Sequence, residues 1–157
     1  NTLNNLTTPT STPTPTPAPT ATPIPLSADA PTFQAGECME IPVGGGKVVQ
    51  CITTIAIRPD GTMQVNIFWA VQNLNQNVTI TKFSDVDNTN IYLTDNFGNR
   101  LDHIGGGGAM SQQVNIDNGE SVEGWFLFPA LDAQATSFIF HDDDNQVQTS
   151  PILKQWP

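Results

Sequence analysis

The chain has 157 residues, and 15 acidic against 5 basic side chains give it a formal net charge of -10 and a sequence pI near 4.1. This length fits one domain. The acidic balance excludes nucleic acids and anionic membrane surfaces as partners, because both carry charge of the same sign as the chain. No apolar run approaches the roughly 18 residues that a membrane-spanning helix needs, so we expect no direct membrane span.

The first 28 residues differ in composition from the rest, since every charged side chain lies at or after Asp29. Residues 1–27 hold nine threonines and seven prolines, with strict Thr-Pro alternation over residues 12–17. Proline fixes φ and lacks an amide donor, so this segment is expected to be an extended, semi-rigid spacer. The same composition is typical of O-glycosylated stalks. We therefore predict a Thr/Pro-rich stalk or assembly tail over residues 1–28 and a folded domain over residues 29–157.

The start of the chain and its two N-x-[ST] sequons bear on how the protein is processed. The sequence starts at Asn1 without a methionine or a hydrophobic signal, which suggests a processed or trimmed form. The sequons make Asn5 and Asn77 candidate glycosylation sites, and Asn77 falls in a predicted turn. Whether either asparagine is glycosylated depends on the machinery of the producing cell.

Cys38 and Cys51 are the only cysteines, and the centre of the interval between them falls at Gly44-Gly45. If these glycines form a hairpin turn, the two cysteines lie opposite each other on paired strands, at a separation that a disulfide bridges. A pair of reduced, buried thiols is the alternative. A zinc site would need two further ligands from a second cysteine pair, which the sequence does not contain. Together with the stalk, the disulfide favours an extracellular or cell-surface location for a secreted protein.

Apolar residues at every second position predict β-strands, most clearly at Met63, Val65, Ile67, Trp69 and Val71. No window of helical length shows helical periodicity. Further strands are expected at residues 48–58, 78–83, 90–94, 112–116, 121–128, 136–141 and 151–154. Eight or nine strands at this spacing indicate an antiparallel β-sandwich.

Turn-forming residues separate the expected strands at residues 59–61, 95–99, 105–108, 117–119 and 142–145. The residues that the alternation directs inward form the predicted core, which comprises Ile52, Val65, Ile67, Trp69, Ile80, Ile91, Leu93, Val122, Phe126, Phe128, Phe138 and Phe140.

Two segments, YLTDNFGN at residues 92–99 and IDNGESVEGWFLFP at residues 116–129, resemble the DUF4352 family of bacterial immunoglobulin-like domains. Members of that family carry a D-x-x-G turn and later an N/P-G-E-x-x-x-G-x-x-x-F strand. The resemblance covers about residues 38–153. It implies an immunoglobulin-like sandwich on a secreted protein or lipoprotein, often on a low-complexity stalk, and it supplies no catalytic residues.

Catalytic groups are sparse in the sequence. His103 and His141 are the only histidines, neither lies in a nucleophile motif such as G-x-S-x-G, and both are expected in surface turns. The acidic residues fall in or near predicted turns, where aspartate commonly hydrogen-bonds locally, so paired carboxylates for glycoside hydrolysis are not expected. The sequence therefore predicts a protein that is not an enzyme.

Calcium is the one cofactor that the sequence suggests. Asp85, Asp87 and Thr89 place oxygen atoms at alternate positions of one predicted loop, which suits a hard cation. Asp142, Asp143 and Asp144 could add further carboxylates. The loop lacks the glycine and the distant glutamate of an EF-hand, and the alternative is an exposed acidic hairpin that favours solubility.

Three aromatic residues form a candidate interaction surface. If Trp69 and Phe126 face the core, alternation directs Phe68 and Trp125 to the opposite face, and Trp156 lies near the end of the chain. Exposed aromatic rings can stack on sugars or anchor a protein partner. The alternative is that these rings lie under a loop or belong to the core.

Two hypotheses follow from the sequence. The first is a non-enzymatic extracellular structural or interaction module, whose sharper form is a cell-surface filament in which the N-terminal tail of each copy packs on its neighbour. The second is a glycan- or cation-binding domain of a stalked surface lipoprotein. The partners expected are thus copies of the chain itself or surface glycans and proteins.

Overall fold

The computed structural model of the chain describes residues 30–73, 78–80, 89–109 and 114–157, with the side chains of residues 78–80 left out. The described residues form antiparallel strands and no α-helix. This confirms the predicted all-β class for the part of the chain that the structure describes.

The strands form three sheets, which we name A, B and C. Sheet A has the order β1-β2-β3-β9-β7, with β1 at Thr32–Val43, β2 at Gly46–Ile57, β3 at Met63–Gln72, β9 at Ser121–Phe128 and β7 at Gly105–Gly108. Sheet C has the order β11-β10-β5-β6, with β11 at Val147–Gln148, β10 at Ser137–Asp142, β5 at Ile91–Asp95 and β6 at Arg100–Asp102, and β12 (Ile152–Leu153) also pairs with β10. Sheet B pairs β4 (Val78–Ile80) with β8 (Val114–Ile116).

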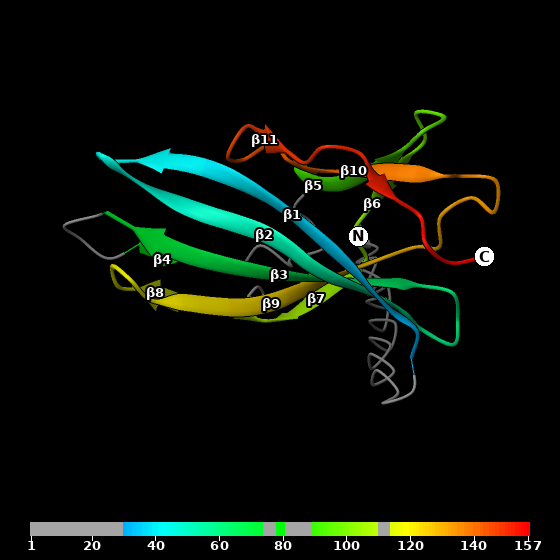
Figure 1. Cartoon of the computed structure of the whole chain (residues 1–157), viewed down its shortest axis with the longest axis horizontal. Coiled ribbons are helices and arrows are strands. Elements are labelled where there is room, and N and C mark those ends of the chain that lie inside the picture. Colours follow the sequence, from blue (N-terminus) through cyan, green and yellow to red (C-terminus); the bar gives the residue numbers. More distant parts are fainter. Residues whose placement is uncertain (1–29, 74–77, 81–88, 110–113) are drawn as a thin grey trace, which may run out of the picture.

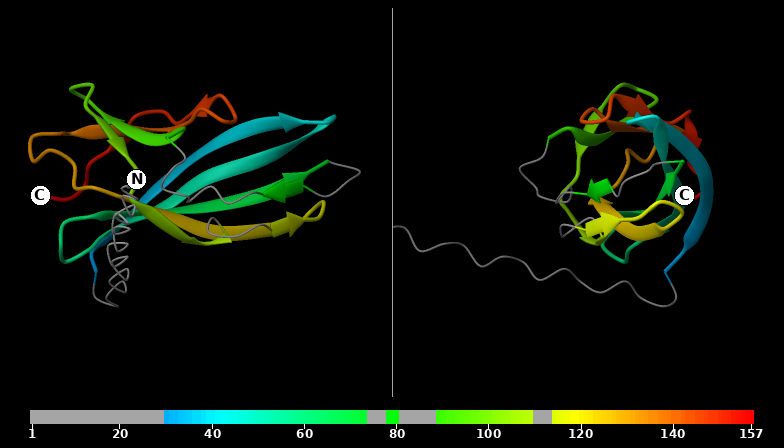
Figure 2. Two further views of the ribbon diagram at one scale, coloured as in Figure 1. Left: turned by 180° about the vertical axis from the view of Figure 1, so that it is seen from behind. Right: turned by 90° about the vertical axis from the view of Figure 1, so that its left-hand side faces the viewer.

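Sheets A and C lie in two layers that face each other (Figure 1). The turned views in Figure 2 show the same layering, with the long strands of sheet A extending beyond sheet C. Phenylalanine rings join the layers, since Phe140 of β10 lies 6.1 Å from Phe126 and 6.3 Å from Phe128 of β9, measured between ring centroids. One apolar core therefore fills the space between the two sheets.

The core is close to the one predicted from alternation. The predicted residues lie in the buried cluster, apart from Val122, which is partly buried against it, and Ile80, whose side chain is outside the described residues. Alternation succeeds here because each long strand has one face on the core and the other towards solvent. The structure adds Met39, Ile41 and Ile55 to the core, from strand positions that the prediction did not include.

Residues 105–108, predicted as a turn, instead form strand β7. The prediction was wrong because glycine was taken only as a turn residue, whereas these four glycines pair in register with β9, with Gly107 opposite Trp125. Trp125 explains the choice of glycine, since a Cβ on Gly107 would lie 2.4 Å from the Trp125 Cζ2 atom. The indole lies across the glycine backbone and takes the place of the missing side chain.

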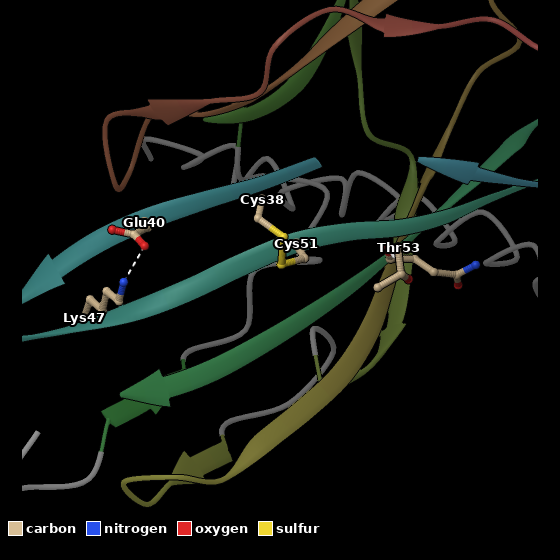
Figure 3. Close-up of a disulfide and its surroundings, with 6 residues drawn as sticks. Cys38, Glu40, Lys47, Cys51 and Thr53 are labelled. Carbon is tan, nitrogen blue, oxygen red and sulfur yellow. Dashed lines mark hydrogen bonds and ion pairs between the residues drawn. A yellow bond between two sulfur atoms is a disulfide. The ribbon is translucent and has the colours of Figure 1, made fainter. Parts of the chain in front are cut away.

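The predicted disulfide is confirmed. Cys38 and Cys51 are direct partners in the β1–β2 ladder, with a turn at Gly44-Gly45, and their Cα atoms lie 4.0 Å apart. Figure 3 shows the bond joining the two strands, with the ion pair between Lys47 and Glu40 beside it. Because Cys38 is exposed and its strand neighbour Met39 is buried, the disulfide lies on the outer face of sheet A.

A buried polar link also joins the two layers. With the Gln50 amide oriented so that its nitrogen faces the carboxylate, this nitrogen donates to Asp142 Oδ2 at 3.0 Å, and the amide oxygen accepts from Trp69 Nε1 at 3.3 Å. Gln50 and Asp142 are both fully buried, Gln50 in sheet A and Asp142 in sheet C. A buried amide and carboxylate are tolerated when both are hydrogen-bonded, so this link fixes how the sheets sit against each other.

Candidate functional site

A hollow of about 250 Å³ lies on sheet A, and we call it the Thr54 pocket. Side chains that point away from the core supply its polar lining, so it opens on the outer face of the sheet and does not enter the core. The pocket is lined by Thr53, Thr54, Asn66, Ile67, Gly108, Glu123, Gly124 and Trp125.

A β-bulge brings two adjacent threonines to this pocket. In a regular strand Thr53 and Thr54 would point to opposite faces. The register of β2 against β3 shifts between Ile52 and Thr54, so Thr53 is inserted without a partner of its own. Both threonines therefore line the pocket, while Ile52 and Ile55 on either side remain in the core.

Two glycines form part of the pocket lining. Gly108 of β7 pairs with Gly124 of β9, and both line the pocket with backbone atoms alone. Gly108 has φ +63, and a Cβ there would lie 2.9 Å from the Glu123 carbonyl oxygen and from the Gly124 Cα. An L side chain at Gly108 would thus be strained and would clash with the backbone of β9, so this position requires glycine.

A directional chain of hydrogen bonds ends in the pocket. Arg58 Nη2 donates to Gln64 Oε1 at 2.8 Å, Gln64 Nε2 donates to Asn66 Oδ1 at 2.9 Å, and Asn66 Nδ2 donates to Thr54 Oγ1 at 2.8 Å. Arg58 is 5% exposed and Gln64 is 7% exposed, so the chain begins at a buried cation. Each bond polarises the next, and the final acceptor is the Thr54 hydroxyl.

Trp125 forms the apolar wall of the pocket. The Arg58 guanidinium carbon lies 5.3 Å from its ring centroid, and the ring crosses Gly107. The prediction that Trp125 and Phe68 point away from the core is consistent with the structure, since both are half-buried while their strand neighbours Phe126 and Trp69 are buried.

The structure separates Trp156 from the other two predicted surface aromatics. Trp156 is half-buried, with its ring centroid 5.4 Å from that of Phe33 and 6.3 Å from that of Phe138. It packs against the core cluster between the sheets. Phe68 instead pairs with Glu123 on the outer face of sheet A, so only Phe68 and Trp125 share a face.

The three consecutive aspartates do not converge on one point. Asp142 points inward, where its carboxylate accepts from the Asn145 backbone nitrogen at 3.1 Å and from Asn145 Nδ2 at 2.8 Å. Burial raises the pKa of Asp142 above its ordinary value, and the hydrogen bonds from Asn145 oppose this rise. Asp143 and Asp144 are exposed, and Asn90 Nδ2 donates to Asp144 at 2.6 Å.

A metal centre is therefore not assembled by the described part of the chain. Among the described residues, no three acidic, histidine or cysteine side chains gather as a metal site requires. Asp85 and Asp87 lie outside the described residues, and Thr89 is exposed beside them in sequence. The predicted sequon asparagines Asn5 and Asn77 also lie outside the described residues.

Both histidines differ from the surface-turn prediction. His103 is 4% exposed, its Nδ1 lies 3.0 Å from the Ile91 carbonyl oxygen, and its ring meets Phe126 edge-on. His141 lies within β10 and stacks on Tyr92 with centroids 4.5 Å apart. The prediction failed because neither histidine carries a local signal of burial, which here comes from partners distant in sequence.

Sequence reasoning missed the residues that give the pocket its polarity, namely Arg58, Gln64, Asn66 and the threonine pair. Gln64 and Asn66 occupy the polar positions of a strongly alternating strand, which indicates the outer face. Their contact with Thr54 depends on the bulge and on the pairing of β2 with β3, and no local sequence pattern predicts either feature.

No protein-family model matches the chain, and no match is found among the curated proteins or the solved structures. Within the described ranges there is no helix with the length and hydrophobicity that crossing a bilayer requires.

Proposed function

We propose that this chain is a non-enzymatic extracellular interaction module that binds its partner through the outer face of sheet A. The observation that supports this proposal is the Thr54 pocket, where a β-bulge brings two threonines into a polar hollow with an aromatic wall. β-Bulges are over-represented at functional sites, where they redirect side chains. In this view sheet C and the core serve as the scaffold.

The extracellular location is part of the proposal. The solvent-facing disulfide between Cys38 and Cys51 is compatible with an oxidising compartment, where such bonds persist. We also propose that the two sheets form an immunoglobulin-like sandwich related to DUF4352 domains, on the strength of the motifs at residues 92–99 and 116–129. The D-x-x-G motif does form a tight turn, since Gly98 has φ +85 and its amide donates to the Asp95 carbonyl oxygen.

The test is retention of the full-length protein on whole cells of the organism that produces it. The outer-face double variant Thr54→Val/Glu123→Gln removes the Thr54 hydroxyl and the negative charge of Glu123 without changing side-chain size. The control variant Thr94→Val/Asp102→Asn makes a similar change on the outer face of sheet C. We expect wild type and control to be retained and the pocket variant to be released, and equal retention of all three would refute the assignment of the binding face.

The filament remains a second proposal, favoured by the charge-free Thr/Pro segment that precedes β1. In this form residues 1–28 of each copy pack on the next copy. Electron microscopy of the full chain beside a chain starting at Asp29 tests it. Regular fibres from the full chain alone support an assembly tail, whereas monomers from both indicate a stalk.

A further inference from the structure

We propose that the Thr54 pocket binds one unit of a neutral, polyhydroxylated ligand, that is, a sugar residue of an uncharged glycan. This inference rests on the proposed function, because it names the ligand class of the same site. Four properties of the pocket carry it, namely its donor, its acceptors, its wall and its size.

The donor is the Thr54 hydroxyl. Its oxygen already accepts a hydrogen bond from Asn66 Nδ2, so the hydroxyl hydrogen is directed to an acceptor elsewhere. The chain from Arg58 through Gln64 and Asn66 points every donor towards Thr54, which makes this hydroxyl a stronger donor than an isolated threonine. Arg58 and Gln64 act as positioning residues, and the pocket presents a polarised O–H to a ligand oxygen.

The acceptors are Glu123 and Thr53. Thr53 Oγ1 donates to the Asn66 carbonyl oxygen at 3.2 Å, which leaves its lone pairs to accept. The exposed Glu123 carboxylate lines the same pocket and accepts only. A ligand that matches this set must both donate and accept within a few ångströms, as adjacent sugar hydroxyls do.

The Trp125 wall and the volume of the pocket suit a single sugar ring. Trp125 supplies an apolar surface for ring C–H groups, next to the side-chain-free backbone of Gly108 and Gly124. The volume of about 250 Å³ lies below the roughly 300–1,000 Å³ of pockets for drug-sized ligands. One sugar unit therefore fits the pocket, and its neighbours in a glycan would extend along the outer face.

Charge disfavours anionic ligands in this pocket, and the direction of the Thr54 hydroxyl disfavours a bare cation. Glu123 and the net charge of -10 oppose anionic ligands such as uronic acids or sulfated sugars. A bare cation would use Glu123 but would meet the hydrogen end of the Thr54 hydroxyl. A neutral polyol satisfies both groups.

The experiment is isothermal titration calorimetry of the full chain with named probes. The neutral probes are the hexasaccharides of glucose in α-1,4 and β-1,4 linkage, of mannose and of N-acetylglucosamine, and the anionic probe is hexagalacturonate. We expect at least one neutral probe to bind, Thr54→Val and Glu123→Gln each to weaken it tenfold or more, and hexagalacturonate to give no heat of binding.

Two matched controls separate loss of the site from loss of the fold. Thr94→Val removes a threonine hydroxyl of similar burial on sheet C, and Glu40→Gln removes a carboxylate on sheet A away from the pocket. Both should bind as wild type does. Circular dichroism and the melting temperature of each variant show whether it is folded.

Three results would overturn the inference. These are no binding of any neutral probe at millimolar concentration, tighter binding of hexagalacturonate than of every neutral probe, or binding that neither pocket substitution changes. If the pocket double variant is still released from cells while no saccharide binds, the interaction module survives with a different ligand and only the sugar assignment fails. If saccharide binding ignores the pocket and retention does too, both proposals fail.

Discussion

The outer faces of sheets A and C have the same strand pattern but present different surfaces. On sheet C the outward side chains are large and pack on one another, since Arg100 lies 3.7 Å from the Tyr92 ring centroid and Tyr92 stacks on His141. On sheet A small residues surround one large one, with Gly107, Gly108 and Gly124 beside Trp125. The hollow on sheet A therefore lies beside an aromatic ring that covers a glycine, whereas the outward side chains of sheet C cover one another.

Hydrogen bonding differs between the two faces in the same way. On sheet C the polar groups satisfy each other, since the Thr94 hydroxyl meets His141 Nε2 at 2.8 Å and Arg100 Nε donates to Asp102 at 2.8 Å. On sheet A the chain of bonds runs in one direction and ends at Thr54 inside a cavity. This difference is why we propose the outer face of sheet A, and not that of sheet C, as the binding face.

The largest expected effect on stability comes from removing the disulfide from the sheet A face. The double substitution Cys38→Ala/Cys51→Ala opens a loop with a sequence separation of 13 residues. Loss of this cross-link should lower the free energy of unfolding by about 3 kcal/mol in the chain-entropy model. Urea unfolding measures this loss, with reduced wild type as the control. An unchanged midpoint would show that the Cys38–Cys51 disulfide does not stabilise the fold.

The second-largest loss of stability is expected from adding a side chain at Gly107, which lies against Trp125. Gly107→Ala places a Cβ against the Trp125 ring and should destabilise the fold by about 1–3 kcal/mol, as overpacking does. Gly105→Ala is the matched control in the same strand, because no atom lies within 4 Å of its added Cβ. This substitution should be neutral or stabilise the fold by up to about 1 kcal/mol, because alanine restricts the unfolded chain. Equal costs in thermal melts would show that Trp125 does not lie on Gly107.

Acidification should lower the free energy of unfolding through His141, which lies on sheet C. Burial lowers the pKa of His141 below its ordinary value of 6.5, with Asp143 opposing and Arg100 reinforcing the shift. The unfolded chain therefore binds this proton more tightly, so stability present above pH 6.5 is lost as pH falls through the lowered pKa. Melting temperatures from pH 7.5 to 5 should fall more for wild type than for His141→Gln. If the melting temperatures of wild type and His141→Gln fall equally with pH, protonation of His141 does not control stability in this range.

The smallest effect is expected from the exposed ion pair beside the disulfide. Glu40→Gln removes the partner of Lys47, and exposed pairs contribute about 0–1 kcal/mol. The urea midpoint should therefore change little, and less still in high salt. A loss of stability as large as that of the disulfide variant would mean that this ion pair is a main stabilising contact of the β1–β2 hairpin.

Much of the fold follows from the sequence because its signals are local. Alternation in residues 63–71 predicts β3 and its core face, and the symmetry of the cysteines about Gly44-Gly45 predicts both the hairpin and the disulfide. These features involve neighbours on one strand or across one turn. The pairing partner need not be known to find them.

The candidate site could not be predicted because it depends on contacts between distant segments. Strand β7 is recognisable only once Trp125 is known to cover its glycines. The bulge at Thr53 follows from the pairing of β2 with β3, and Asp142 is buried because Gln50 from another sheet reaches it. Trp125 is the part of the site that the sequence analysis, from alternation alone, directed to the outer face.

The most direct test of the binding face is a two-dimensional amide NMR titration of the full chain with the neutral hexasaccharide that binds best. We expect the shifted amides to be concentrated at Thr53, Thr54, Glu123 and Gly124, and the amides of Tyr92 and His141 to be unshifted. Shifts centred on Tyr92 and His141, or no shifts at all, would contradict this expectation.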